Sequence, residues 1–367
     1  MNDPGRAMGL LVVGLGYLGA QRAAAALRTR GVRLVAVTDL DPDRAEAVAA
    51  RLGVVAVPDL ATGLESGGID AVVIATPHAD HAEAIQLSLE AGKHVLCEKP
   101  LTIRSEDARR LATLADESRL RLSTGLNHRF YPPVRDALAL AGSGRIGRVE
   151  SVRAEIGHLA GPEFLQSWHT DVARSGGGTL MDNGPHACDL IRRFLGEVVL
   201  AKGFVRQEVQ LPIGCETEAH ALFRNHDNAV ADLHASWTLR SGYLTVEVRG
   251  TEGFLKIETA PWRLSGSLAD GHKIHRRYIF ERIEDRIHKI RFGSELSIVR
   301  ELEAFATPSS AHPRPGATGW DGCRVTEMIQ AVYESDRLGD EIHLKPLLVH
   351  LPASGRRRAL SDREPRR

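Results

Sequence analysis

The spacing of hydrophobic residues changes near residue 125, and this change predicts two domains of different fold. Before that point, short apolar runs alternate with longer stretches of helix-forming residues. Such alternation is typical of a doubly wound α/β domain with a parallel sheet. Strands are expected at 10–13, 34–38, 54–57, 71–75, 94–97 and 121–124, with helices at 20–29, 43–52, 79–91 and 105–118.

After residue 125, apolar and polar residues alternate over many short segments, which predicts a mostly antiparallel sheet with helices on one face. Strands are expected at 148–157, 198–209, 218–223, 229–239, 244–249 and 254–258, with helices at 134–141, 179–195, 294–306 and 318–336. We therefore predict an α/β domain at 1–125, an α+β substrate and oligomerisation domain at 126–350, and a disordered, arginine-rich tail at 351–367.

Length, charge and cysteine content indicate what class of protein the chain belongs to. A chain of 367 residues exceeds one ordinary core. The 47 basic and 47 acidic residues cancel, which argues against nucleic-acid or membrane partners. No apolar run reaches membrane-spanning length, and residues 1–8 lack a signal-peptide core. Four cysteines without CxxC pairing indicate reduced thiols. These features predict a cytoplasmic enzyme.

A glycine-rich turn follows the first predicted strand. Gly14 permits the turn, Gly16 lets the backbone approach a pyrophosphate, and Gly19 allows close packing of helix on strand. Asp39 ends the second strand and can accept both ribose hydroxyls, while its charge repels a 2′-phosphate. The pattern favours NAD over NADP, although the nearby Arg44 leaves dual use open. The alternative is a glycine turn in another α/β domain.

A second motif, Glu98-Lys99-Pro100, directly follows the strand predicted at 94–97. Thr76 and Pro77 similarly follow the strand at 71–75. Ligands bind at the carboxyl edge of open α/β sheets, so Lys99 is placed where a substrate can meet a dinucleotide. The alternative for Lys99 is a surface cation.

From about Gly9 to Pro346, the chain resembles the glucose–fructose oxidoreductase and inositol dehydrogenase (Gfo/Idh/MocA) family. The resemblance rests on GLGYLG at 14–19, Ala75-Thr76-Pro77 followed by His81, AGKHVLCEKPL at 91–101, the segment 127–130, SGGGTLMDNGPHACDL at 175–190 and DGCRVTEMIQAVYES at 321–335.

The resemblance implies a catalytic set of Lys99, Asp182 and His186 and a cis peptide bond between Lys99 and Pro100. Asp182 and His186 are four apart, so one helix face can present both. His186 is expected to be the base and Lys99 to hold the hydroxyl oxygen, although the two can exchange roles. A purely structural His186 is an alternative. No third ligand appears beside Asp182 and His186, so no metal is predicted.

The motifs and the resemblance also imply contacts to the ligands. The residues expected at the cofactor are Gly14, Gly16, Tyr17, Leu18, Gly19, Asp39, Thr76, Pro77, His81, Glu98 and Lys99. Those expected at the substrate are Lys99, Asn127, Arg129, Trp168, His169, Asp182 and His186, with Asp189 able to orient the site. His128 and His169 depart from the family's usual residues. Taken alone, His158, His169 and His220 have no motif support and are more typical of structural or surface groups.

The predicted function is an NAD(H)-dependent dehydrogenase that interconverts a secondary alcohol and a ketone on a sugar, nucleotide sugar or inositol-type cyclitol. A small hydroxy acid clamped by Arg129 is the competing substrate class. Three further functions fit the same motifs: an enzyme that recycles tightly held NAD, a non-redox enzyme that uses NAD, and a non-catalytic sensor. The resemblance implies a homodimer or homotetramer.

Overall fold

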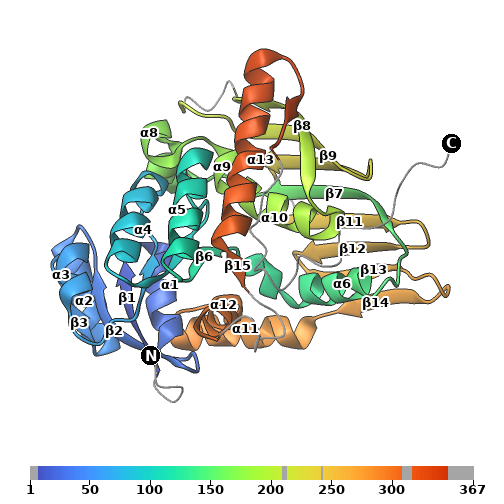
Figure 1. Ribbon diagram of the computed structural model, residues 1–367. Helices are drawn as coiled ribbons and strands as arrows, with labels where there is room; N and C mark the ends of the chain where they lie inside the picture. Colours follow the sequence, from blue (N-terminus) through green and yellow to red (C-terminus); the bar gives the residue numbers. More distant parts are fainter. Residues whose placement is uncertain (1–6, 209–212, 241–242, 308–315, 346–367) are drawn as a thin grey trace.

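The structure, a computed structural model, describes residues 7–208, 213–240, 243–307 and 316–345 (Figure 1). Two sheets organise it, one in each part of the chain. The predicted tail at 351–367 lies outside the described residues. Among the described residues, no helix is both long and apolar enough to span a membrane.

The first sheet is built mainly from the first 125 residues. Its strands are β1 (Met8–Val13), β2 (Val32–Thr38), β3 (Val55–Ala56), β4 (Ala71–Ile74), β5 (His94–Glu98), β6 (Leu122–Gly125) and β15 (Ala317–Thr318). Their order is β15-β6-β5-β4-β1-β2-β3, and all pairs except β15 with β6 are parallel. The strand order reverses between β1 and β4, and ligands bind at such a switch point.

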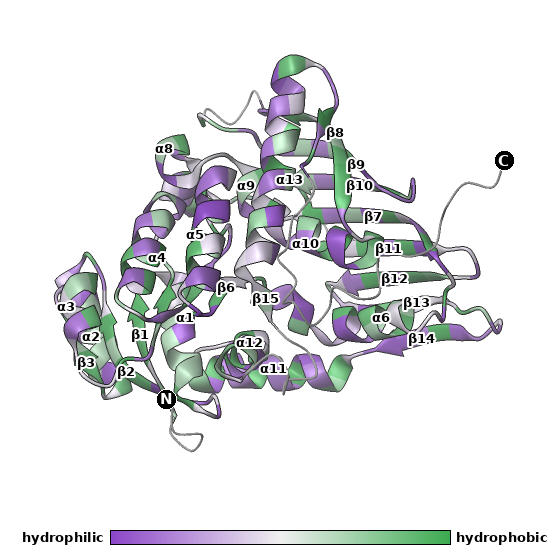
Figure 2. Cartoon of the chain, in the orientation of Figure 1, coloured by the Kyte–Doolittle hydropathy of each residue, from purple (hydrophilic) through white to green (hydrophobic). Residues whose placement is uncertain are grey.

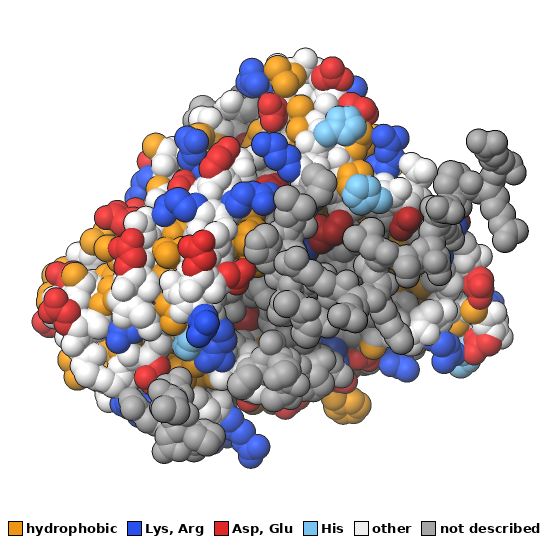
Figure 3. Space-filling model, in the orientation of Figure 1, with side chains coloured by type: hydrophobic (Ala, Val, Ile, Leu, Met, Phe, Trp, Pro, Cys, Tyr) orange, Lys and Arg blue, Asp and Glu red, His pale blue; other side chains and the backbone are white. Residues whose placement is uncertain are grey.

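The connecting helices confirm the predicted alternation. They are α1 (Tyr17–Ala26), α2 (Pro42–Leu52), α3 (Leu60–Glu65), the 3₁₀ turn η1 (His78–Asp80), α4 (His81–Glu90) and α5 (Ser105–Glu117). The central strands β1 and β4 are apolar and fully buried, as expected for a sheet covered on both faces (Figure 2). On the face drawn in Figure 3, basic and acidic side chains are interspersed over α4 and α5, in keeping with the balanced charge.

The second sheet has nine strands in the order β14-β13-β12-β11-β7-β10-β9-β8-β16. They are β7 (Val149–Gly157), β8 (Val198–Arg206), β9 (Glu218–Asn225), β10 (Val230–Ser236), β11 (Leu244–Gly250), β12 (Phe254–Thr259), β13 (Trp262–Ser267), β14 (Lys273–Arg277) and β16 (Ile342–His343). Among these described strands only β7 with β10 is a parallel pair, so the sheet is mostly antiparallel, as predicted.

One face of this sheet carries helices (Figure 1). The elements after β6 are η2 (Asn127–Phe130), α6 (Pro132–Gly142), α7 (Pro162–Leu165), η3 (Trp168–Thr170), α8 (Val172–Ser175), α9 (Thr179–Asp182), α10 (Gly184–Leu195), α11 (Ile279–Phe292), α12 (Leu296–Ala306) and α13 (Gly319–Leu338). Helix α10 packs on β7, α13 on β8, and α6 on β12 and β13. Alternate residues of β9 and β10, such as Ala221 and Leu233, fill the core beneath these helices.

The late part of the chain returns to the first domain, so the predicted boundary at residue 125 misses a contribution to that domain's core. Ile298, Leu302 and Phe305 of α12 belong to the same buried cluster as the β1 and β2 side chains. Strand β15 also extends the first sheet. Helix α11 and strands β13 and β14 were not predicted, since α11 buries no residue and the two strands have little apolar alternation.

The helix predicted at 179–195 is two helices in the structure, because it is interrupted at Asn183. Pro185 has no backbone N–H, and its ring would clash with the carbonyl one turn earlier, so an unbroken helix cannot pass through it. The N–H of His186 bonds to the Asn183 carbonyl instead of that of Asp182. The break therefore leaves the Asp182 carbonyl free to accept another donor.

Candidate active site

A cavity of about 1460 Å³ lies at the carboxyl ends of β1, β2, β4 and β5. One wall comes from these strand ends and the other from the second domain, including Asp182, His186 and Tyr243. This volume exceeds that of a typical pocket for one small ligand. It is large enough for a dinucleotide together with a second molecule.

Most of the predicted site residues share this cavity. Those that line it are Gly14, Gly16, Tyr17, Leu18, Asp39, Thr76, Pro77, Glu98, Lys99, Asn127, Trp168, His169, Asp182 and His186. Gly19, His81 and Arg129 are not among the lining residues. Each of these three has another role in the structure.

The glycine turn is shaped by close backbone contacts. Gly14 has a φ of +82°, and a Cβ on it would lie 2.7 Å from the Ala75 carbonyl oxygen. A Cβ on Gly19 would lie 1.7 Å from the Gly14 carbonyl oxygen, so Gly19 packs α1 against β1 instead of lining the cavity. A Cβ on Gly16 would meet nothing within 4 Å, so the chain is open to a ligand there.

Asp39 connects this turn to the end of β2. Its Oδ2 accepts from the Leu15 N–H at 2.6 Å, and its Oδ1 accepts from Arg44 Nη1 at 3.1 Å. Helix α1 begins after Gly16 without a side-chain cap, so its first N–H groups are available to phosphate. The arrangement fits a dinucleotide, with the pyrophosphate at α1 and a ribose at Asp39.

His81 holds together the loops beside the cavity and is not among the residues that line it. It is fully buried, with Nδ1 at 2.8 Å from the Pro100 carbonyl oxygen and Nε2 at 3.0 Å from that of Thr76. The prediction that His81 contacts the cofactor is therefore not supported by its position. It fixes Thr76 relative to the turn that carries Lys99.

Lys99 joins the two domains. The Lys99–Pro100 peptide bond is cis, as predicted. Lys99 Nζ donates to Asp182 Oδ1 at 2.8 Å and to the freed Asp182 carbonyl at 2.7 Å. Asp182 Oδ2 also accepts from Trp237 Nε1 at 3.3 Å. Burial would raise the pKa of Asp182, but the Lys99 ammonium holds this pKa well below its ordinary value. The Asp182 carboxyl group is therefore ionised near pH 7.

His186 stacks on His128, with ring centroids 3.6 Å apart and planes 14° apart. Burial lowers the pKa of His128 to about 3, with a smaller effect of the Lys99 charge. Burial, followed by the neighbouring His128 and Lys99, places the pKa of His186 well below its ordinary value. The buried Nδ1 atoms of both rings have no hydrogen-bond partner among the described residues. Both rings are therefore neutral near pH 7.

The substitution His128→Phe is expected to weaken the pH dependence of stability. Between the ordinary His pKa of 6.5 and the folded value of about 3, the unfolded chain binds a proton at His128 and the folded chain does not. Stability therefore falls as the pH drops through this window, by up to about 1.4 kcal/mol per pH unit for one such group. Phenylalanine keeps the stacked shape and removes this contribution. Equal pH slopes for the two proteins in denaturant unfolding would contradict the assignment.

Arg129 does not face the cavity, which corrects its predicted role in substrate binding. Its Nε and Nη2 donate to the two oxygens of Asp189 at 2.7 and 2.5 Å, and Nη1 donates to Asp321 at 3.2 Å. The side chain is buried and joins η2 to α10 and α13. Asp189 thus orients Arg129. The clamp invoked for a hydroxy acid is absent from this position.

Glu98 lines the cavity but is already paired. Its Oε1 accepts from Arg22 Nε at 2.7 Å, and Arg22 Nη1 reaches Glu301 Oε2 at 2.5 Å. All three side chains are buried, and burial raises the pKa of Glu301 to about 7 despite the opposing charge of Arg22. This chain of charges links β5, α1 and α12, and Glu98 and Arg22 line the cavity.

Aromatic and imidazole groups surround the remaining space. Trp168 stacks on His169 with centroids 3.9 Å apart, and its ring meets His78 edge-on at 4.8 Å. Burial lowers the pKa values of His78, His158 and His169, so these rings are neutral. Asn127 Nδ2 donates to Ser297 Oγ at 3.0 Å.

Several residues of this wall were not predicted. His158, expected to be structural or at the surface, lines the cavity, and so do His128, Asn183 and Tyr243. Trp237 does not line the cavity but donates a hydrogen bond to Asp182. His128 and Asn183 lie within the 127–130 and 175–190 segments that carried the family resemblance, although neither was named as a site residue. His158, Tyr243 and Trp237 lie near strand ends without a motif.

Comparisons with known proteins agree with this architecture. Residues 8–126 match the model of an oxidoreductase family with an NAD-binding Rossmann fold, GFO/IDH/MocA, and residues 134–256 match the GFO/IDH/MocA C-terminal domain. The scyllo-inositol 2-dehydrogenase (NAD(+)) of Bacillus subtilis (strain 168) is 32% identical over 257 residues, covering 68% of this chain and 73% of the relative. A dTDP-3,4-didehydro-2,6-dideoxy-alpha-D-glucose 3-reductase of Saccharopolyspora spinosa is 34% identical over 232 residues, covering 62% and 67%.

Solved structures show the same fold. A levoglucosan dehydrogenase in complex with NADH and levoglucosan superimposes with a TM-score of 0.81 at 22% identity, covering 93% of this chain and all of that chain. The folds of both domains are thus those of one family of proteins. The chain belongs to the GFO/IDH/MocA family of oxidoreductases with an NAD-binding Rossmann domain.

Proposed function

We propose that the protein is an NAD(H)-dependent dehydrogenase that interconverts a secondary alcohol and a ketone on a sugar, nucleotide sugar or cyclitol. One observation carries the proposal. The Lys99–Asp182 ion pair and the neutral His186 line the same cavity as the glycine turn and Asp39. A dinucleotide held by the turn therefore shares its space with groups that can bind a hydroxyl and move its proton.

In this proposal the chain's own residues manage the proton and the orientation, while the nicotinamide ring of bound NAD supplies the hydride chemistry. Lys99 Nζ has a third N–H beyond the two bonds to Asp182, and this N–H is offered to the substrate oxygen. Asp182 fixes the ammonium in place. His186 is uncharged and can accept the hydroxyl proton. Lys99 then stabilises the negative charge that develops on the oxygen.

A polyhydroxylated ring is the proposed substrate class. Neutral imidazoles both donate and accept hydrogen bonds, and Trp168 offers an aromatic face to a sugar ring. The relatives named above act on an inositol and on a nucleotide-linked sugar, which supports the same class here. The burial of Arg129 against Asp189 removes the main argument for a small hydroxy acid.

We propose NAD as the preferred cofactor, because Arg44 is neutralised by Asp39 and Asp41. The substitution Asp39→Asn is expected to lower the ratio of kcat/KM for NAD over NADP by about 10–100-fold, since it removes a repelling charge and releases Arg44 toward a 2′-phosphate. Steady-state kinetics with both cofactors measure this ratio. In the double variant Asp39→Asn/Arg44→Ala, the increase in kcat/KM for NADP caused by Asp39→Asn should disappear, because Arg44 can no longer bind the 2′-phosphate. A wild-type preference for NADP would contradict the assignment.

The function is tested by following absorbance of NADH with sugars, sugar phosphates, nucleotide sugars and inositols, followed by identification of the product. A ketone derived from a hydroxylated ring is expected. If the best substrate lacks such a ring, the substrate class is wrong. Product formed without net NADH indicates tightly held, recycled NAD or non-redox chemistry, and binding without turnover indicates a sensor. We further propose a cytoplasmic homo-oligomer, to be tested by sedimentation and by fractionation of cells.

A further inference from the structure

The second sheet carries a cluster of candidate metal ligands on the face opposite its helices. Ala219, Ala221 and Leu233 belong to the core under the helices, so the alternate residues of β9 and β10 face the other way. Glu218 and His220 are two apart on β9, and His234 stands directly opposite His220 on β10. Strand register thus brings one carboxylate and two imidazoles to a single place.

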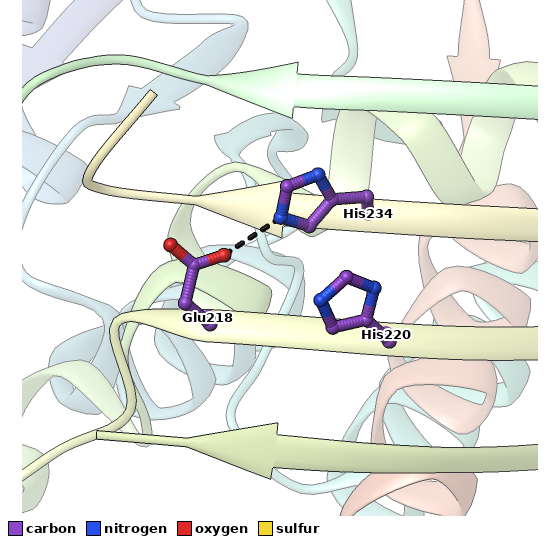
Figure 4. A group of neighbouring side chains, drawn as sticks. All are labelled: Glu218, His220 and His234. Atoms are coloured by element: carbon purple, nitrogen blue, oxygen red, sulfur yellow. Dashed lines mark hydrogen bonds and ion pairs between the residues drawn. The ribbon is translucent and has the colours of Figure 1, made fainter. Parts of the chain in front are cut away.

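The three side chains are already in contact (Figure 4). Glu218 Oε2 lies 2.7 Å from His234 Nε2. The rings of His220 and His234 are parallel within 6°, with centroids 4.4 Å apart. One ligand atom from each residue lies within 4.8 Å of the other two. Among the described residues, this is the group of His, Cys, Asp and Glu side chains that meets such a spacing.

Neighbouring groups fix two of the three ligands. Glu218 Oε1 accepts from Ser236 Oγ at 2.7 Å and from Thr238 Oγ1, which leaves Oε2 directed toward His234. On the other side of His234, Nδ1 lies 3.4 Å from Glu155 Oε2 on β7. A carboxylate that holds the far nitrogen of a histidine fixes its tautomer and raises its basicity as a ligand, as around bound zinc.

We propose that Glu218, His220 and His234 bind a divalent transition metal, with Zn²⁺ the best match, outside the dehydrogenase cavity. Two histidines and one carboxylate form a known zinc ligand set, and the fourth position is left to water. Tetrahedral coordination at about 2.1 Å requires ligand atoms about 3.4 Å apart. For metal to bind, the distance between Glu218 Oε2 and His234 Nε2 must increase from 2.7 Å to this spacing, and the exposed side chain of His220 must turn toward the pair. With the metal at His234 Nε2, the proton of the neutral ring sits on Nδ1, which faces Glu155, and the metal replaces the Glu218–His234 hydrogen bond.

The proposed role is structural. Ser236 and Thr238, which hold Glu218, flank Trp237 in sequence, and Trp237 is buried on the opposite side and donates to Asp182. A metal that ties β9 to β10 here would fix the strand end that carries Trp237. Because the metal binds the folded state and not the unfolded chain, bound metal should raise the melting temperature.

The test uses the full chain, freed of metal with a chelator and equilibrated with Zn²⁺. Metal per chain is measured by elemental analysis for wild type, His220→Ala, Glu218→Gln and the control His275→Ala, an exposed histidine on β14 of the same sheet. Wild type and His275→Ala should bind one equivalent more than the other two. Zinc bound by histidines of the cavity would be common to all four and cancels in the difference.

Two further readouts keep the outcome decisive. Co²⁺ should give the visible absorption of a tetrahedral site in wild type and in His275→Ala but not in His220→Ala. Zn²⁺ should raise the melting temperature of wild type more than that of His220→Ala, in which an exposed side chain is truncated and the apo fold is expected to remain. Equal zinc content and equal melting shifts in wild type and His220→Ala would overturn the proposal, and the cluster would then be a Glu218–His234–Glu155 ion bridge.

Discussion

Replacing His186 by alanine is expected to lower turnover by about 10²–10⁴-fold, the usual contribution of a positioned general base. The neutral imidazole lines the same cavity as Lys99 and Asp182, and its loss leaves the substrate hydroxyl without a proton acceptor. NAD affinity should stay nearly unchanged, because the glycine turn and Asp39 of the first domain are the groups expected to hold the dinucleotide. Steady-state kinetics and a fluorescence titration with NADH measure the two quantities.

His272→Ala is the matched control, since His272 is exposed and is not among the residues that line the cavity. It should keep full turnover. The variant His128→Phe tests whether His128 only supports His186 by stacking or also takes part in proton transfer. It keeps an aromatic ring against His186 but removes the imidazole of His128. If His186→Ala keeps nearly full turnover, His186 is not the base, and Lys99 takes that role.

Replacing Lys99 by methionine is expected to reduce turnover by at least about 10²-fold and to destabilise the fold by about 3–5 kcal/mol. Asp182 would remain buried without its cation, and this uncompensated charge is the cause of the instability. The loss of turnover has a different cause, namely the missing donor to the substrate oxygen. Denaturant unfolding and kcat are measured on the same preparation.

The double variant Lys99→Met/Asp182→Asn distinguishes these two effects. Asparagine removes the buried charge, so most of the stability should return, while turnover should not. Recovery of both would show that Lys99 acts only through folding. A stable and fully active Lys99→Met protein would contradict the role assigned to the ion pair.

The first domain was predictable because its fold is encoded locally. Apolar runs mark the strands, and two glycines of the turn, Gly14 and Gly19, make close backbone contacts that only glycine permits. The cis bond at Lys99 followed from the family resemblance and not from local physics. Strand existence in the second domain was predictable from alternation until β13 and β14, where alternation is weak.

The site was less predictable wherever distant segments meet. Arg129 has no local feature that distinguishes a substrate clamp from a partner of Asp189, 60 residues away, or Asp321, 192 residues away. The helix break at Asn183 could have been expected from Pro185. That the break frees the Asp182 carbonyl to accept from Lys99 is seen only in the structure. The prediction of no metal site considered Asp182 and His186 alone. His220 and His234 lie on different strands, and only the pairing of β9 with β10 brings them together, which the sequence does not reveal.

We propose that a hydride passes between a ring carbon and NAD beside Lys99 and His186. The most direct test is to supply the best polyol substrate with deuterium on the oxidised carbon and to analyse the recovered cofactor by mass spectrometry. We expect one deuterium on the nicotinamide ring, formed at least about 10²-fold more slowly by His186→Ala and by Lys99→Met. Consumption of substrate with no deuterium in the cofactor, bound or released, would contradict it.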